Sequence, residues 1–557
     1  MDIRSFITMN MALELADLDP QMKARLTPLS WAVEGEHEAV VKMLLERDDV
    51  NPNTVDWRGR TPLFRAASKG SERVVKLLLE REDVNPNTPN EDGETPLARA
   101  VWRCRDGVVK LLLERWDTNP NIAADNGETP LLKASEKGRE EVVKMILERN
   151  DINPNAVGGC DNSPLWRAAC GGYQGVVEML LERKDVNADS ADESGRTPLL
   201  MAASYGHGGI VKILLERDDV NPNSVDNDGE TPLFQAACWG HAGAVRMLLE
   251  RNDINAEHTN ESGRTPLLIA AWEGYEGVVR MLLERGDVDP NTVDNIGRTP
   301  LSGAAYKGHE GVVKALLERN DINPNAVMCD AETPLKNAAW KGHEGIVKML
   351  LERDDVNPNP VGKGGQTPFL MAAWGGHEGI VRMLLERGEV NPNATDGFGQ
   401  TPLSKAAWYG RKTIVKILLE LTDINADPRD RSGQTPLFLA AQDGREEVVN
   451  MLLKRGDVNP NAADHDGETP LSRAACNGYR GVVRILLERV GVNSDMANLA
   501  GETPLSQALK CGHHAIAKSI SEHTNFIPTL DGDEFTALSS FHLPDLDLRV
   551  SPMTGRL

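Results

Sequence analysis

Hydrophobic residues recur in one pattern along almost the whole chain. A unit such as GRTPLFRAASKGSERVVKLLLEREDVNPN, which begins at Gly59, holds two short apolar stretches separated by a glycine turn. Thr61 is a good helix N-cap and Pro62 suits the first helical position, so a short helix is expected to start there and to end at Gly70. The second stretch places two valines and two leucines on one helical face and stops at Asn-Pro-Asn. The pattern predicts two antiparallel helices per unit.

The tripeptide Thr-Pro-Leu, or a near copy, marks each unit. Fifteen copies begin between Thr27 and Thr503, always 34 residues apart, without insertion or deletion. One unit cannot hide its apolar faces alone, so neighbouring units must stack into a continuous core. The sequence therefore predicts an all-α solenoid of fifteen repeats over residues 27–522, with Asp-x-x-Gly turns between units.

These units resemble ankyrin repeats, whose pattern is a β-turn, TPLHxAA, a Gly-His turn and a VVxLLL second helix. The copy GRTPLSGAAYKGHEGVVKALLERNDINPN, from Gly297, matches along the whole unit. Two departures are a period of 34 rather than 33 residues and the loss of the TPLH histidine, as at Ser30 and Phe64. Such similar tandem copies look most like the long ankyrin arrays of filamentous fungi. The resemblance implies an ankyrin-repeat α-solenoid with short β-turn fingers, and a non-enzymatic scaffold whose concave groove binds another protein or a peptide segment.

Two segments flank the predicted solenoid. Residues 1–26 are expected to form an N-terminal helical cap, and residues 523–557, rich in proline, aspartate and glycine, a flexible tail. In the last repeat Ser519 and Ser521 stand at positions where other repeats have leucine. Serine there is expected of a terminal repeat whose outer face meets water.

Composition narrows the partner classes. The 557 residues include 84 acidic and 61 basic ones, for a net charge of −23, so neither nucleic acid nor an anionic membrane is an expected partner. We find no apolar run long enough to span a membrane and expect no membrane insertion. Seven cysteines, in no paired spacing, indicate reduced thiols in a cytoplasmic or nuclear protein. We expect a monomer.

Catalytic and metal-binding motifs are not evident. His-Glu recurs in the turn between helices, as at His309-Glu310, but Val313 stands where a HExxH zinc motif needs its second histidine. We find no Gly-x-Ser-x-Gly, no P-loop and no Gly-x-Gly-x-x-Gly after a strand. We therefore expect no enzymatic activity, cofactor or metal, and interpret the turn histidines as structural.

Aromatic residues mark a candidate binding face. Counted from the threonine of Thr-Pro-Leu as zero, positions +4, +7 and +8 share one face of the first helix, away from the core positions +2, +5 and +6. The ankyrin resemblance implies that this face lines the groove. Exposed apolar patches often mark interfaces, and Trp is enriched among binding hot spots. The candidate strip comprises Trp102, Trp239, Trp272, Tyr306, Trp340, Trp374, Trp408 and Tyr409, widened by Ile269 and Met371 at +4.

Two alternatives stay open for this strip. The rings could instead pack on one another and on neighbouring first helices, because Trp and Tyr serve both uses. The whole array could also be a structural spacer, or could self-associate, and bind no specific ligand in its groove.

A basic stretch lies on the same face nearer the N-terminus. Its members at +4 and +8 are Arg65, Lys69, Arg99, Arg103, Lys133 and Lys137, followed by Arg167. They could attract an acidic or phosphorylated segment, or finger carboxylates such as Glu94 and Glu128 could neutralise them. A nucleic-acid role for this stretch ranks last. We interpret the Glu-Arg pairs that end the second helices, Glu46-Arg47 through Glu488-Arg489, as a solvated outer face.

Overall fold

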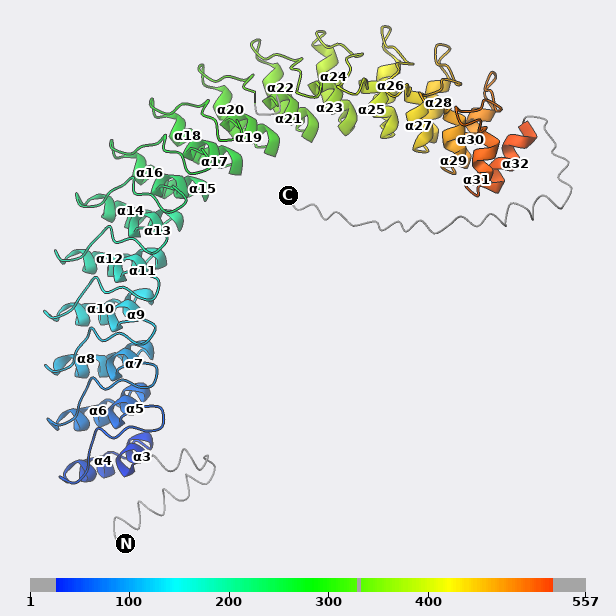
Figure 1. Cartoon of the computed structure of the whole chain (residues 1–557). Coiled ribbons are helices and arrows are strands. Elements are labelled where there is room, and N and C mark those ends of the chain that lie inside the picture. Colours follow the sequence, from blue (N-terminus) through cyan, green and yellow to red (C-terminus); the bar gives the residue numbers. More distant parts are fainter. Residues whose placement is uncertain (1–26, 328–331, 524–557) are drawn as a thin grey trace, which may run out of the picture. The chain divides into compact units, whose positions relative to one another are not determined.

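The structure, a computed structural model, describes residues 27–327 and 332–523 (Figure 1). These residues form thirty helices, α3 to α32, two to each repeat. Contacts divide the chain into two compact units, Met1–Cys329 and Asp330–Leu557, and each is described separately. The predicted solenoid is confirmed. The cap expected at residues 1–26 lies outside the described residues, as does the expected tail beyond His523.

Within each unit the first and second helices of the repeats alternate along the chain. The first helices are α3 (Pro28–Glu34), α5 (Pro62–Lys69), α7 (Pro96–Trp102), α9 (Pro130–Glu136), α11 (Pro164–Gly171), α13 (Pro198–Ser204), α15 (Pro232–Cys238), α17 (Pro266–Glu273) and α19 (Pro300–Lys307) in the first unit, and α21 (Pro334–Lys341), α23 (Pro368–Gly375), α25 (Pro402–Trp408), α27 (Pro436–Gln442), α29 (Pro470–Cys476) and α31 (Pro504–Lys510) in the second. The second helices are α4 (Glu38–Leu45), α6 (Glu72–Leu79), α8 (Asp106–Glu114), α10 (Glu140–Leu147), α12 (Gln174–Leu181), α14 (Gly208–Leu215), α16 (Ala242–Leu249), α18 (Glu276–Leu283) and α20 (Glu310–Leu317), then α22 (Glu344–Leu351), α24 (Glu378–Glu386), α26 (Lys412–Leu419), α28 (Glu446–Leu453), α30 (Arg480–Leu487) and α32 (His514–His523).

The Thr-Pro-Leu sequence starts every first helix for a local reason. Proline occupies the first turn, and the threonine or serine before it accepts a hydrogen bond from the backbone N–H three residues on. In α5 the Thr61 hydroxyl accepts from the Phe64 N–H at 3.1 Å, and Gly70, at φ 87°, ends the helix in the left-handed region. The predicted start of the first helix and its end at the glycine are thus confirmed, whereas the second helix ends earlier than predicted: α6 ends at Leu79, before Asn85-Pro86-Asn87.

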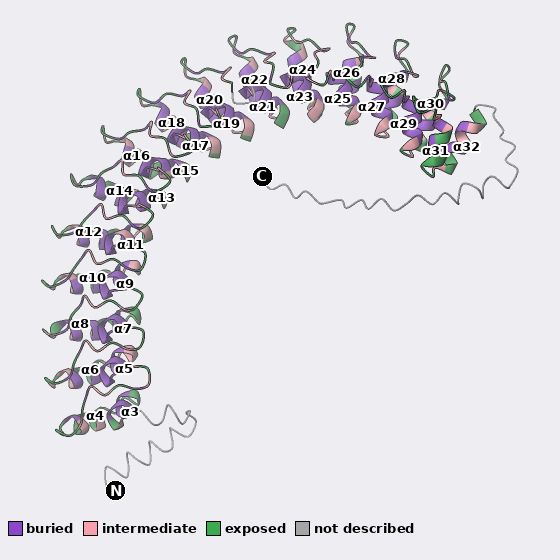
Figure 2. Cartoon of the chain, in the orientation of Figure 1, coloured by how far each residue is buried: buried purple, intermediate pink, exposed green. Residues whose placement is uncertain are grey.

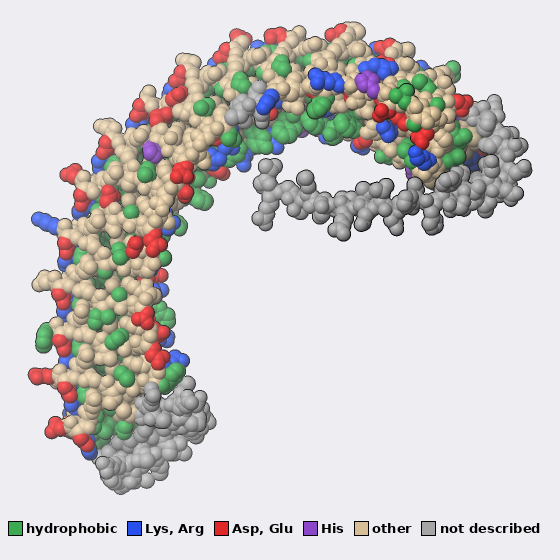
Figure 3. Space-filling view, viewed as in Figure 1, with side chains coloured by type: hydrophobic (Ala, Val, Ile, Leu, Met, Phe, Trp, Pro, Cys, Tyr) green, Lys and Arg blue, Asp and Glu red, His purple; other side chains and the backbone are tan. Residues whose placement is uncertain are grey.

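The core runs between first and second helices and from repeat to repeat. Leu63, Ala66 and Ala67 of α5 and Val75 and Leu78 of α6 are fully buried, and buried residues follow the same pattern in the next repeat, α7 and α8 (Figure 2). The small alanine pair lets neighbouring first helices pack closely. Charged side chains lie on the surface of the units (Figure 3).

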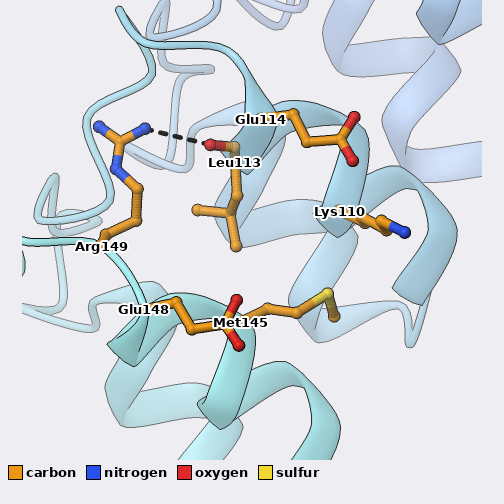
Figure 4. A pocket seen from close by; sticks show the side chains of 6 residues that line it. All are labelled: Lys110, Leu113, Glu114, Met145, Glu148 and Arg149. Carbon is orange, nitrogen blue, oxygen red and sulfur yellow. Dashed lines mark hydrogen bonds between the residues drawn. The ribbon is translucent and has the colours of Figure 1, made fainter.

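Arginines that end the second helices join neighbouring repeats. Arg149 donates to the Asp151 carboxylate at 2.9 and 2.7 Å, and to the carbonyl oxygen of Leu113, in the preceding second helix, at 3.1 Å (Figure 4). A cation there satisfies helix C-terminal carbonyls that have no partner within the helix. This corrects our interpretation of the Glu-Arg pairs: glutamates such as Glu114 are exposed, but the arginines are structural. The same bridge recurs at Arg81, Arg115, Arg183, Arg217, Arg251, Arg319 and Arg455.

The Asn-Pro-Asn loops form a second ladder between repeats. The Asn223 amide donates to the Asp253 carbonyl of the next repeat at 2.7 Å, and its Oδ1 accepts from the Asn255 N–H at 2.8 Å. Asp189 stands at the same position in its repeat. Its Oδ2 accepts from the Asn221 N–H at 2.8 Å, but its Oδ1 is buried without a partner among the described residues. A carboxylate has no N–H to donate, so the contact between these two repeats, which we call a joint, lacks one hydrogen bond.

Arg251→Leu tests the arginine bridge. It removes the 2.7 Å hydrogen bond to the Leu215 carbonyl and the pairing with Asp253. Loss of a charge-assisted hydrogen bond costs about 1.5 kcal/mol, so amides at the end of α14 are expected to exchange roughly tenfold faster. Leu421 occupies this position two residues before Asp423, and Leu421→Arg is expected to slow exchange at the end of α24. If both variants exchange like the wild type, the bridge adds no stability.

Asp189→Asn tests the asparagine ladder and its dependence on pH. An amide restores the missing donor, so we expect the joint to gain about 1 kcal/mol near pH 7. Burial raises the pKa of Asp189, Asp219 adds to the rise, and the Asn221 N–H opposes it. With a raised folded pKa, the wild-type joint is most stable below the unfolded pKa of about 3.9 and loses stability as pH rises through the folded pKa. The benefit of asparagine should therefore be larger near pH 7 than near pH 4.

Hydrogen exchange of α13 and α14 at both pH values measures this benefit. The matched control is Asn223→Asp, which should weaken its own joint and make that joint sensitive to pH. An equal gain from Asp189→Asn at both pH values would contradict the titration of Asp189.

Candidate functional site

Aromatic residues at +7 and +8 leave part of their rings exposed at the ends of the first helices. Trp239 is 60% exposed and Trp340 40%. Hydrophobic side chains gather along this edge of α21 to α25 (Figure 3). We call Tyr205, Trp239, Trp272 and Tyr306 the first aromatic strip, in the first unit, and Trp340, Trp374, Trp408 and Tyr409 the second aromatic strip, in the second unit.

The first aromatic strip is a layered arrangement of rings and cations. The Trp272 and Tyr306 rings stack with centroids 6.0 Å apart and planes 8° from parallel. Gly303 makes room beneath them, because a Cβ there would lie 3.1 Å from Cε3 of Trp272. The Arg298 guanidinium lies 4.5 Å and the Lys307 ammonium 4.8 Å from the centroid of the indole. These contacts hold the ring in place while Trp272 stays half-buried.

The second aromatic strip is built around a buried ion pair. The Tyr409 ring lies 5.7 Å from that of Trp374 and 5.4 Å from that of Trp408. Beneath them, Lys405 Nζ lies 4.7 Å from the Trp374 centroid and 3.2 Å from Asp396 Oδ2. The side chains of Lys405 and Asp396 are only 8% and 1% exposed. The rings thus pack on one another, as one of our two alternatives has it, and still present an exposed edge.

Three of the residues that we assigned to the exposed face at +4 are buried, which corrects our assignment, whereas Arg99 and Lys133 at the same position are half-buried. Ile269 and Met371 are each 4% exposed and Arg65 is 7% exposed. Neighbouring first helices approach closely, and between α17 and α19 the +7 ring of Trp272 lies over the +4 position of the next repeat, Gly303. Ile269 and Met371 therefore support the strips from below and do not widen them.

Most of the basic stretch is neutralised by carboxylates within the chain. The ion pairs are Arg65 with Asp56 and with Glu34 at 2.9 Å, Lys69 with Glu34 at 3.4 Å, Arg99 with Glu94 at 3.1 Å, and Lys133 with Glu128 at 3.4 Å. Arg103 and Lys137 are exposed and have no carboxylate at ion-pair distance within the described ranges. The Arg103 guanidinium lies 4.8 Å from the Trp102 centroid.

In some repeats the residue that precedes the second helix fixes the carbonyl of the +7 tryptophan in the repeat before it. His309 Nε2 lies 3.0 Å from the Trp272 carbonyl oxygen, and Arg411 Nε donates to that of Trp374 at 3.1 Å. The structural interpretation of the turn histidines is confirmed here. The hydrophobic and aromatic pattern of the sequence did not connect these residues, or Lys405, with the strips. Each of them stands at a constant distance from the +7 position of its own repeat: His309 and Arg411 three residues after it and Lys405 three residues before it. This spacing is the signal in the sequence that could have identified them.

Other candidate sites are weaker. A hollow of about 210 Å³ between α8 and α10 is lined by Lys110, Glu114, Met145 and Glu148, whose charged groups do not converge (Figure 4). Within residues 27–327 and 332–523, no group of three or more His, Cys, Asp or Glu residues could hold a metal ion. None of the helices in these ranges is both long and apolar enough to cross a membrane.

Comparison with known proteins identifies the same repeat. The family model described as "Ankyrin repeats (3 copies)" matches overlapping segments from residue 6 to residue 531. Among solved structures, the human ASB11 ankyrin repeat domain is 27% identical; the match covers 41% of this chain and 98% of that one, with a TM-score of 0.36. No curated protein matches.

Lys405→Met tests whether the buried ion pair supports the second aromatic strip. It leaves the Asp396 carboxylate buried without its cation, and we expect the repeat to lose about 3 kcal/mol of stability. Local hydrogen exchange of α25 measures the loss. The double variant Lys405→Met/Asp396→Asn removes both charges and should recover most of it. If the single variant is as stable as the wild type, the pair does not support the strip.

Proposed function

Because the chain belongs to the ankyrin-repeat family, whose repeats typically bind proteins, we propose that it is a non-enzymatic scaffold and that each of its two aromatic strips, taken by itself, binds a segment of another protein. The observation that carries the proposal is the exposure of Trp239 and Trp340 in a chain whose aromatic residues make up only 4%. Indole rings on an accessible face are typical anchors of protein interfaces.

The rings are positioned before any partner arrives. Trp272 is stacked on Tyr306 and flanked by two cations, and its carbonyl is bound by His309. A partner would therefore have little side-chain entropy to remove on binding, which favours affinity. Arg298 and Lys405 are paired with Asp294 and Asp396, but the exposed Lys307 places positive charge at the rim of the first aromatic strip. A segment that combines apolar side chains with a carboxylate therefore suits that strip.

The basic stretch has a smaller part in this proposal. Arg103 and Lys137 are exposed and would extend the surface beside Trp102, whereas Arg65, Lys69, Arg99 and Lys133 are held in ion pairs with carboxylates of the chain. Arg65 is buried in its pair with Asp56, and the more exposed Lys69–Glu34 pair is worth at most about 1 kcal/mol, so a partner gains little by replacing Glu34 there.

Trp239→Ala and Trp340→Ala test the two aromatic strips separately. Peptides selected from a displayed random library for binding to the full chain are the probes. We expect one of the variants, or each for its own set of peptides, to weaken binding by at least about 2 kcal/mol, roughly 30-fold in Kd, because truncating a hot-spot Trp removes its buried contact. Calorimetric titration of each variant measures the change.

Trp116→Ala is the matched control, because Trp116 is 87% exposed and lies in the turn after α8, outside both strips. It should bind every selected peptide like the wild type. Selected peptides that bind both strip variants at full affinity would rule out the proposed surface. Light scattering over a concentration series separately reports self-association, the competing function.

A further inference from the structure

Two cysteines of neighbouring first helices lie against each other near the end of the second unit. Cys476, at +7 of its repeat, and Cys511, at +8 of the next, have Sγ atoms 2.9 Å apart. This separation exceeds the length of a disulfide bond by only about 0.9 Å. Both are free thiols; Cys511 is exposed and Cys476 is half-buried.

The same two positions meet elsewhere in the first unit but without a second thiol. Cys170 at +7 has Tyr205 at the facing +8 position, and Cys238 at +7 has Glu273 there. The repeat geometry therefore brings a +7 side chain against the +8 side chain of the next repeat, and the sequence decides which two residue types face each other there. Cys170 and Cys238 are internal controls for a cysteine at this place with no partner thiol.

We propose that Cys476 and Cys511 form an oxidisable dithiol, a modification site whose co-substrate is a low-molecular-weight disulfide such as glutathione disulfide. The exposed Cys511, as thiolate, attacks one sulfur of glutathione disulfide and releases the first glutathione as its thiolate. Cys476 then loses its proton to solvent, attacks Cys511 Sγ and expels the second glutathione. Two protein thiols give up two electrons, and one glutathione disulfide becomes two glutathione thiols.

The surroundings of the two thiols set the order of these steps. Burial, and then the neighbouring Cys511 thiol, raise the pKa of Cys476 to about 11. Cys476 is thus protonated at neutral pH and less accessible, so it suits the resolving role. Its position beside Cys511 gives it a high effective concentration, which favours the intramolecular disulfide over a lasting mixed disulfide with glutathione.

The disulfide would link the last repeat covalently to the repeat before it. Helix α31 buries only Pro504, Gln507 and Ala508, whereas α29 buries five residues. A terminal repeat has a neighbour on one side only, and such repeats open most readily. A covalent link from α29 to α31 restrains that opening, because it limits the freedom of the detached repeat.

Incubation of the full chain in glutathione buffers of increasing oxidised fraction tests the proposal. After alkylation of free thiols and digestion with trypsin, Cys476 and Cys511 fall in separate single-cysteine peptides, residues 474–480 and 511–518. We expect mass spectrometry to find these two peptides linked, with Cys170 and Cys238 still alkylated. In Cys476→Ser the linked product should vanish, and Cys511 should carry glutathione instead.

Hydrogen exchange of the α32 amides measures directly whether the disulfide slows the opening of the last repeat. We expect the oxidised wild type to exchange at least about tenfold more slowly there than the reduced wild type, and Cys511→Ala to show no such difference. If Cys511 accumulates only the glutathione adduct in the wild type, at buffer ratios that modify the exposed Cys104, the dithiol site is wrong. If the two cysteines become linked but the exchange rates in α32 do not change, the disulfide does not restrain the opening of the last repeat.

Discussion

The face between neighbouring repeats is the contact on which the rest of this molecule depends. A repeat of two short helices exposes as much apolar surface as it hides until the next repeat covers it. Alanine at +5 and +6 makes that covering close, because it lets the first helices approach. Everything else that distinguishes the surface, including the aromatic strips and the facing cysteines, results from side chains brought together across this face.

Polar groups reinforce the same face beyond the ends of the second helices. There the arginines bind the C-terminal carbonyls of the preceding second helix, and a few residues further along the same loop the asparagines link consecutive loops. Both devices pair backbone groups that apolar packing alone would leave without partners. They also make the joints unequal: a leucine at 421 or an aspartate at 189 removes one bond from one joint and leaves its neighbours intact. In such an array local opening should follow these weak joints.

The aromatic strips show how structural support and exposure are combined in one side chain. Trp374 packs on Tyr409 and has the Lys405 ammonium 4.7 Å from its ring centroid, while its position at the helix end keeps part of it accessible. The +4 layer below is closed, as Ile269 and Met371 show. The exposed surface is therefore narrower than helical periodicity alone suggested, and it lies on a rigid support.

The sequence by itself determined the repeat, the register and the boundaries of the first helices, because Thr-Pro and the glycine turn act within a few residues and recur at a constant interval. It also placed the aromatic residues in columns. Only the tertiary structure decided that +4 is covered, that Arg149 bridges two helices and that Cys476 meets Cys511. Those outcomes depend on the distance and rotation between one repeat and the next, which the periodicity of a single helix does not contain.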